Sequence, residues 1–225
     1  MEEEMKAIGE VAKIAGKAID GATKAGQFIA QYLNGPLDVA SGIIKDKLTY
    51  IRWERRVRLM DRATEFLHQR GLEAPTRSVP MSIIVPILQL GSMEEDNELQ
   101  DLWAQLLVNA ADTGSGIVVQ PAFIGILQNL SSHDAVILEK IYSFPVEYES
   151  LALYTSQLPA TVLTGKPSAE TDPPVDVKLS LGNLSRLGLI EGAMFWGGNS
   201  NFRYVYQTVL GRAFVKACRG KELQG

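Results

Sequence analysis

The sequence predicts a mainly α-helical protein in which a single β-hairpin lies near the C-terminus. Apolar residues recur at intervals of three and four through most of residues 5–142, as they do along the buried faces of helices. Strict alternation occurs at Phe202, Tyr204 and Tyr206, directly after the Gly-rich stretch 197–201, which is typical of a strand that follows a turn. The chain has 225 residues, of which 46% are hydrophobic, enough for a buried core.

Three parts are expected along the chain. Residues 1–72 are predicted to form an N-terminal amphipathic helical hairpin and residues 73–130 a central helical segment, so that the two together make a helical bundle. Residues 131–225 are predicted to form a C-terminal domain that contains the hairpin.

The first helix is predicted from about Met5 to Leu33, and one of its faces carries a narrow apolar seam. Small residues at intervals of four within the seam would let another backbone approach closely. Since such a helix needs an apolar partner, we expect the seam to serve assembly or membrane binding. The longest uncharged stretch is too short to span a bilayer, which takes about 18 to 20 apolar residues. The seam consists of Ile8, Val11, Ala18, Ala22, Gly26, Phe28, Ile29 and Ala30.

The second helix is predicted from about Leu37 to Arg70, after a break at Gly35 and Pro36 and before a stop at Gly71. Its middle carries a basic run around a tryptophan. One interpretation is a solvated face whose arginines pair with acids elsewhere, for example in the acidic stretch 94–101. The other interpretation is a contact with phosphates or lipid headgroups. The arginines concerned are Arg52, Arg55, Arg56 and Arg58.

The central segment is predicted to contain three shorter helices. The first runs from about Met81 to Leu90. Ser92 and Glu95 have the spacing of a capping box, so the second helix is expected to begin at Ser92 and to continue to Ala110. Acidic residues in its first turn complement the helix dipole and need no metal ion. The third helix covers residues 121–130.

The C-terminal domain is predicted to resemble a winged helix. Three helices, a hairpin and a final helix follow one another, and in such a module the third helix and the hairpin form the usual contact surface. Four leucines of the third helix, Leu179, Leu181, Leu184 and Leu187, are expected to face inward. The predicted helices cover 134–142, 148–158, 177–187 and 210–219, and the predicted strands cover 189–196 and 202–208.

A winged helix raises the question of DNA binding. The third helix offers Lys178, Asn183 and Arg186, and the hairpin offers Arg203. Strong DNA binders make roughly six to ten phosphate contacts, whereas this set holds only three cations. We therefore favour a winged helix used for packing or protein contact. A DNA-binding transcriptional regulator is the alternative function.

No catalytic, metal or cofactor site is predicted, and no small-molecule substrate is implied. Cys218 has no neighbouring histidine in the sequence, and neither His68 nor His133 has a metal ligand four residues further along the chain. The 22 basic and 26 acidic residues give a net charge of −4, which provides no general attraction for nucleic acid. A single cysteine and an acidic start, with no export signal, indicate a reducing, cytoplasmic setting.

Four stretches resemble the bacterial Abi-alpha (abortive infection alpha) family. The most specific of them is the acidic-Leu-Gln-Asp-Leu-Trp-Ala-x-Leu-Leu-x-Asn run from Glu98 to Asn109, and the resemblance covers about Gly9 to Tyr142. It implies a part in phage exclusion and supplies no catalytic residues. Because the residues themselves offer no catalytic set, we expect that part to be non-enzymatic. We therefore expect a homo-oligomer or a partner defence protein, in the cytoplasm or peripherally on the inner membrane. The stretches are Gly35–Leu37, Leu48–Arg55, Glu94–Ala110 and Pro121–Ala135.

Overall fold

The protein is mainly helical, with one small antiparallel sheet of three strands. The chain divides into two compact units, residues 1–121 and residues 122–225. The boundaries predicted at residues 72 and 130 stay predictions. The computed structural model describes residues 26–29, 31–32, 53–144, 151–164, 171–194 and 200–219.

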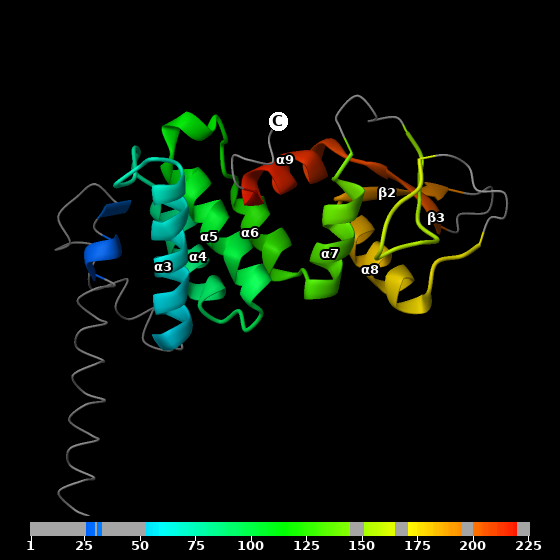
Figure 1. Ribbon diagram of the computed structural model, residues 1–225, viewed down its shortest axis with the longest axis horizontal. Helices are drawn as coiled ribbons and strands as arrows, with labels where there is room; N and C mark the ends of the chain where they lie inside the picture. Colours follow the sequence, from blue (N-terminus) through cyan, green and yellow to red (C-terminus); the bar gives the residue numbers. More distant parts are fainter. Residues whose placement is uncertain are drawn as a thin grey trace, which may run out of the picture. The chain divides into compact units, whose positions relative to one another are not determined.

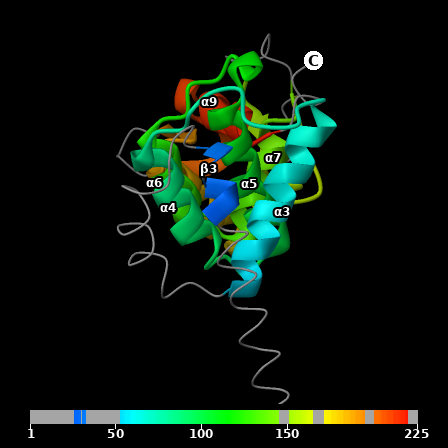
Figure 2. The same cartoon turned by 90° about the vertical axis from the view of Figure 1, so that its left-hand side faces the viewer.

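Unit 1 is built on three helices that pack against one another: α3 (Trp53–Gln69), α4 (Met81–Gly91) and α5 (Asn97–Ala111) (Figures 1 and 2). Their apolar faces form a core in which Leu59 and Trp103 are almost fully buried. Gly91 lets α4 approach both residues, because a Cβ there would meet the Trp103 side chain at 3.0 Å. A short 3-10 turn, η1 (Thr113–Ser115), follows α5.

The helix ends of unit 1 confirm most of the sequence predictions. The described part of the second predicted helix is helical, and Gly71 ends it with a positive φ of 71°. The expected start of the next helix at Ser92 is wrong. Ser92 is the buried C-cap of α4 and its hydroxyl donates to the Leu88 carbonyl. The cap of α5 is Asp96, whose side chain accepts from the backbone nitrogens of Glu98 and Leu99.

Unit 2 combines helices with the sheet. The sheet order is β1-β3-β2, and both pairings are antiparallel. α8 packs against α7 and β2, and the side chain of Phe214 on α9 meets Phe123 on α6 edge to face. The elements are α6 (Pro121–Gln128), α7 (Ser132–Ile141), β1 (Leu153–Tyr154), α8 (Val175–Arg186), β2 (Ile190–Met194), β3 (Ser200–Gln207) and α9 (Val209–Cys218).

The helix predicted over residues 148–158 is wrong where the structure describes it, and the predicted single hairpin is part of a larger sheet. Leu153 and Tyr154 form β1 and pair with Val205 and Tyr204 of β3. Residues 153–155 alternate between buried and half-buried, as a strand does when one of its faces is covered. Thr155 closes the pairing, because its backbone nitrogen donates to the Arg203 carbonyl at 3.0 Å.

The start of α9 packs tightly against the end of α7. The Tyr142 hydroxyl donates to the Leu189 carbonyl at 2.5 Å and accepts from the Thr208 backbone nitrogen at 3.0 Å. Thr208 caps α9, since its side chain accepts from the Gly211 nitrogen at 2.8 Å. Gly211 leaves no room for a side chain, because a Cβ there would overlap the Tyr142 hydroxyl and the Leu189 carbonyl.

Candidate functional surfaces

The end of the predicted N-terminal seam is buried within unit 1. Residues 26–29 and 31–32 are helical, with Phe28, Ile29 and Tyr32 buried and Gln27 and Gln31 exposed. The segment is therefore amphipathic, and its apolar face lies against its own chain. Gly26 is half-buried, with no atom near its missing side chain. Ile8, Val11, Ala18, Ala22 and Ala30 lie outside the described residues.

Tyr32 ties this segment, which we call the seam end (residues 26–32), to the rest of unit 1. Its carbonyl accepts from the Val79 backbone nitrogen at 2.9 Å, and its ring lies 4.6 Å from that of Phe28. Burial raises the pKa of the Tyr32 hydroxyl, an effect that the nearby Arg70 charge opposes. The hydroxyl finds no hydrogen-bond partner among the described residues. A buried polar group without a partner costs about 1 to 3 kcal/mol, which weakens the hold on the seam end.

Two arginines fix the stretch that follows α5. The Arg70 guanidinium donates to Asn109 Oδ1 at 2.8 Å and to Gln105 Oε1 at 3.0 Å. It also forms an ion pair with Asp112 at 3.2 Å, in which the side chains are only 4% and 2% exposed. Arg77 donates to three backbone carbonyls, those of residues 109, 110 and 117. These contacts stabilise the turn around η1 and leave both guanidiniums occupied.

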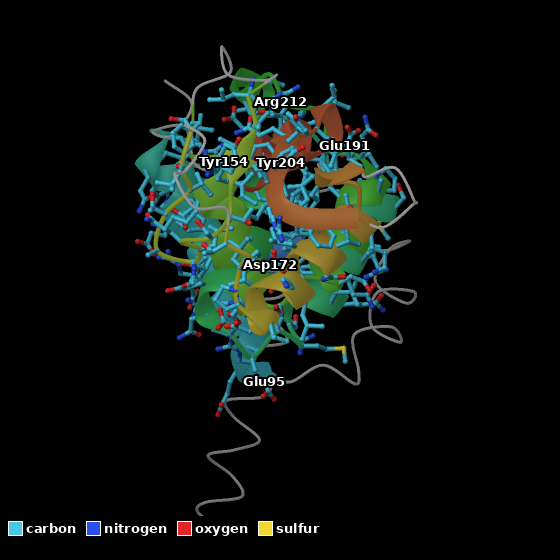
Figure 3. All side chains as sticks on the ribbon, turned by 90° about the vertical axis from the view of Figure 1, so that its right-hand side faces the viewer. Glu95, Tyr154, Asp172, Glu191, Tyr204 and Arg212 are labelled. Carbon is cyan, nitrogen blue, oxygen red and sulfur yellow. The ribbon has the colours of Figure 1, made fainter. Side chains whose placement is uncertain are left out.

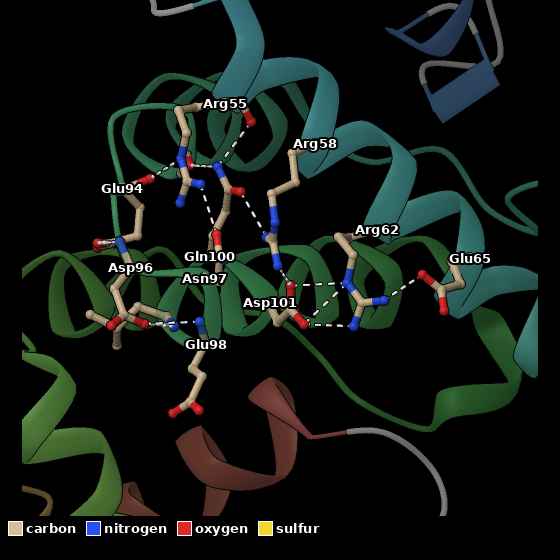
Figure 4. Close-up of polar contacts among 12 residues, drawn as sticks. Arg55, Arg58, Arg62, Glu65, Glu94, Asp96, Asn97, Glu98, Gln100 and Asp101 are labelled. Atoms are coloured by element: carbon tan, nitrogen blue, oxygen red, sulfur yellow. Dashed lines mark hydrogen bonds and ion pairs between the residues drawn. The ribbon is translucent and has the colours of Figure 1, made fainter.

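The basic run of α3 contacts the first turns of α5 and the residues before it (Figure 4). Arg58 pairs with Asp101 at 2.9 Å and donates to Gln100 Oε1 at 2.8 Å. Arg62, which the sequence did not single out, pairs with the same Asp101 at 2.6 Å. Arg55 donates to the Glu94 carbonyl at 2.7 Å and to Asn97 Oδ1 at 2.8 Å. The predicted pairing between this run and the acidic stretch 94–101 is therefore confirmed for Arg58.

The phosphate or lipid interpretation of the basic run stays a prediction. Arg52 lies outside the described residues. Arg56 is half-buried, and burial lowers the pKa of its guanidinium. Its Nε has no hydrogen-bond partner among the described residues. Because Arg55 and Arg58 are held by α5 and the turn before it, an anion at this face would have to compete with those contacts.

In unit 2, one aspartate binds two of the four residues predicted to contact nucleic acid. Asp172 pairs with Lys178 of α8 at 2.6 Å and with Arg203 of β3 at 2.5 Å (Figure 3 labels Asp172). Hydrogen bonds from Lys178 and then from Arg203 lower the pKa of the Asp172 carboxyl to about 2. The carboxylate therefore stays charged at neutral pH and offsets the positive charges of Lys178 and Arg203.

The other two predicted contacts, Asn183 and Arg186, are also engaged within unit 2. The Asn183 amide donates to Asp134 Oδ2 at 2.9 Å and to the Asn129 carbonyl at 2.8 Å. Its own oxygen accepts from Arg186 at 2.7 Å. Asp134 is the third helical residue of α7 and completes a capping box with Ser131. Asn183 therefore joins α8 to the start of α7.

The ionisation of Asp134 is expected to stabilise unit 2. Burial alone would raise the pKa of its carboxyl, but hydrogen bonds from Ser131, Ser180 and Asn183 together lower it below the ordinary 3.8. A lowered pKa contributes stability above the ordinary value, and that contribution is lost as the pH falls through the folded value. We expect Asp134→Asn to reduce the free energy of unfolding by about 1 to 2 kcal/mol at pH 7.

The difference between Asp134→Asn and the wild type should narrow as the pH falls below about 4. Urea unfolding at a series of pH values, followed by circular dichroism, measures it. Asp61→Asn, at an exposed position of α3, is the control and should track the wild type throughout. A difference that stays constant across the series would mean that Asp134 acts through packing and not through its charge.

The outer face of α8 is apolar at two positions. Val175 is 74% exposed and Leu179 is 72% exposed, and they lie one helical turn apart. The prediction that Leu179 faces inward is wrong, whereas Leu181 and Leu184 are buried as expected. Tyr154 and Tyr204, with ring centroids 5.6 Å apart, form a second surface, an aromatic one, on the sheet (Figure 3). Both surfaces are suited to binding through apolar contact.

The candidate reactive groups are His68 in unit 1 and His133 and Cys218 in unit 2. Cys218 is buried, and burial raises the pKa of its thiol. His133 Nε2 lies 3.6 Å from Asp176 of α8, and His68 Nε2 lies 3.7 Å from Glu73. Within the described parts of both units, no three His, Cys, Asp or Glu side chains gather as metal ligands would. Among the helices described, none combines the length and hydropathy needed to cross a membrane.

Comparison with known proteins gives one finding. A family model described as abortive infection alpha matches residues 54–218. The match includes the basic run of α3 from Glu54 onward and continues beyond Tyr142 through α8, the hairpin and α9. It therefore extends into unit 2, past the stretches that carry the resemblance in the sequence. Neither a curated protein nor a solved structure shows significant similarity to the chain.

Proposed function

Since the chain belongs to the abortive infection alpha family, we propose that it is a non-enzymatic antiphage defence protein that acts by assembly with other copies of itself. In the resting protein the seam end is held against unit 1. Release of the N-terminal segment makes its apolar seam available for assembly in the cytoplasm. A partner defence protein and the surface of the inner membrane are the alternative occupants of the released seam.

The observation that carries this proposal is the burial of Phe28, Ile29 and Tyr32 against their own chain. Burying three large apolar side chains favours the held state by several kcal/mol. The Tyr32 hydroxyl, which has no hydrogen-bond partner among the described residues, works in the opposite direction. A segment that combines these two properties is stable at rest and can still be released by a partner that binds the released form better.

For unit 2 we propose a winged-helix-like module that contacts protein. The order of α7, β1, α8, β2, β3 and α9, with β1 added beside the hairpin, supports the winged-helix interpretation. The apolar residues on the outer face of α8 support protein contact. Lys178 and Arg203 are bound to Asp172, which leaves little local positive charge for a DNA backbone.

Substitution of Phe28 and Tyr32 by alanine is expected to release the seam. Removing the two rings weakens the hold by about 3 kcal/mol or more, which corresponds to at least about a hundredfold shift toward the released form. Limited thermolysin digestion of the full chain should then cut faster beside Ile29, which is buried in the wild type. Sedimentation velocity should show larger assemblies than the wild type forms at the same concentration.

The matched control is Gln27→Ala with Gln31→Ala, which alters the exposed face of the same segment. It should behave like the wild type in both measurements. Equal digestion of all three proteins would contradict the held state. Faster digestion without assembly would contradict the assembly role. Flotation with vesicles of phosphatidylethanolamine and phosphatidylglycerol would then show whether the released seam binds a membrane instead.

A further inference from the structure

The exposed face of α8 forms a continuous stripe. At about 100° per residue, Val175, Leu179, Gly182 and Arg186 fall within about 60° of one another around the helix. Val175, Leu179 and Arg186 are exposed and Gly182 is half-buried. The buried residues of α8 lie on the opposite side, so the stripe points away from the core of unit 2. We call these four residues the α8 stripe.

We propose that the α8 stripe pairs with the α8 stripe of a second copy of this chain, with the two helices antiparallel. A two-fold axis that passes between residues 180 and 181 places Leu179 opposite Gly182 of the other copy. The same axis places Val175 opposite Arg186. Every member of the stripe therefore meets another member, as a two-fold interface requires.

The chemistry of the facing residues fits this pairing. Gly182 has no side chain, and among the described residues a Cβ there would find one atom within 4 Å, a ring carbon of Phe202 at 4.0 Å. The helices can therefore approach closely at the point where Leu179 of the other copy would insert. Val175 would cover the aliphatic stem of Arg186, whose guanidinium would then reach Asp176 of the other copy. Asp176 is exposed and carries the opposite charge.

The occupant is a second copy because the stripe is complementary to itself in shape and, together with the adjacent Asp176, in charge. One pair of short helices covers less than the roughly 800 Å² per partner of a standard interface. The association is therefore weak, with a dissociation constant between about 1 μM and 1 mM. This inference gives the proposed assembly a defined surface in unit 2, and to that extent it rests on the proposed function.

Sedimentation velocity of the full chain over a concentration series tests the pairing. The wild type should pass from monomer to dimer, and Val175→Glu should raise the dissociation constant at least tenfold. Val118→Glu is the matched control, because Val118 is 76% exposed in unit 1 and the substitution is the same. A wild type that stays monomeric up to about 1 mM would overturn the proposal. Equal effects of the two substitutions would also overturn it.

A charge exchange tests the register. Asp176→Arg and Arg186→Asp each place like charges opposite each other and should weaken the dimer several-fold, whereas the double variant should restore it. Gly182→Ala should keep or raise the stability of the monomer, because alanine favours helix, and should nevertheless weaken the dimer. A dimer that withstands Gly182→Ala and both single charge changes would contradict this arrangement of helices.

Assembly through the α8 stripe and assembly through the released seam respond to different substitutions. Assembly that appears after Phe28→Ala with Tyr32→Ala, and that Val175→Glu does not affect, would support assembly through the released seam. It would contradict pairing through the α8 stripe. Dimerisation that Val175→Glu abolishes, with no response to the Phe28 and Tyr32 substitutions, would support pairing through the α8 stripe. It would contradict the proposal that release of the seam causes assembly.

Discussion

Replacement of Gly211 by alanine is expected to lower the free energy of unfolding by about 3 kcal/mol, the upper part of the range for overpacked cores. A Cβ at this position would lie 1.9 Å from the Tyr142 hydroxyl oxygen, 2.3 Å from the Leu189 carbonyl oxygen and 2.7 Å from Tyr142 Cζ. Neither oxygen can move away easily, since the Tyr142 hydroxyl is hydrogen-bonded to the Leu189 carbonyl and to the Thr208 nitrogen. The added methyl group would therefore push the start of α9 away from α7 and weaken the hydrogen bonds that Tyr142 makes there.

Urea unfolding followed by circular dichroism measures this effect. Gly125→Ala is the matched control, because Gly125 lies inside α6 of the same unit and has no atom within 4 Å of its missing Cβ. Alanine there should be neutral or stabilise the protein by up to about 1 kcal/mol, as expected for helix propensity. Similar small effects at both glycines would show that the corner around Tyr142 yields more readily than its hydrogen bonds suggest.

Removing the charge of Arg70 should destabilise unit 1 by about 3 to 5 kcal/mol, as measured when one member of a buried ion pair is lost. Arg70→Met keeps most of the volume but leaves the Asp112 carboxylate buried without its cation. Asn109 and Gln105 would lose a donor at the same time. The same denaturation experiment measures the change, and Arg62→Met, in a more exposed network, should cost less than about 1 kcal/mol.

A double variant identifies the cause of the Arg70 effect. Asp112→Asn removes the negative charge and keeps an oxygen that can accept from the Gly114 nitrogen, as Asp112 does now at 2.7 Å. Arg70→Met combined with Asp112→Asn should therefore be more stable than Arg70→Met alone, with a coupling of at least about 1 kcal/mol. Strictly additive effects would indicate that lost packing around Arg70, and not an unpaired charge, is responsible.

Local rules predicted most elements but not all of their limits. Gly71 and Gly188 end helices with positive φ, whereas α7 begins at Ser132, two residues before its predicted start. The start of α5 was wrong because Ser92 and Asp96 are both acceptable caps. The position at which α4 ends determines which residue caps α5, because the Ser92 hydroxyl is still hydrogen-bonded to a carbonyl of α4. Periodicity alone does not contain that information.

The inward orientation of Leu179 could have been rejected from the sequence. Leu179 and Leu181 are two positions apart, about 160° around a helix, so they cannot share a face. The extra strand β1 was harder to foresee, because only two residues form it, and their partners Tyr204 and Val205 lie 50 and 52 positions further along the chain. Pairings of this kind depend on the tertiary structure and not on a local preference.

The contacts of the candidate surfaces were also predicted only in part. The signs of the charges predicted that the basic run would meet the acidic stretch 94–101, and Arg58 with Asp101 confirms it. The contribution of Arg62 follows from the same helix face and could have been included. Asp172 binds Lys178 and Arg203 only because its loop passes both α8 and β3. The path of that loop has no signature in the sequence.

The shielded thiol of Cys218 has a practical consequence for experiments on the seam end. The chain has no other cysteine, and this one is 3% exposed with a raised pKa, so we expect it to react slowly with maleimides in the folded protein. A cysteine introduced at the exposed position Gln27 would take up a fluorophore selectively. Its emission would then report the departure of Phe28 and Tyr32 from unit 1 in real time, in an otherwise natural sequence.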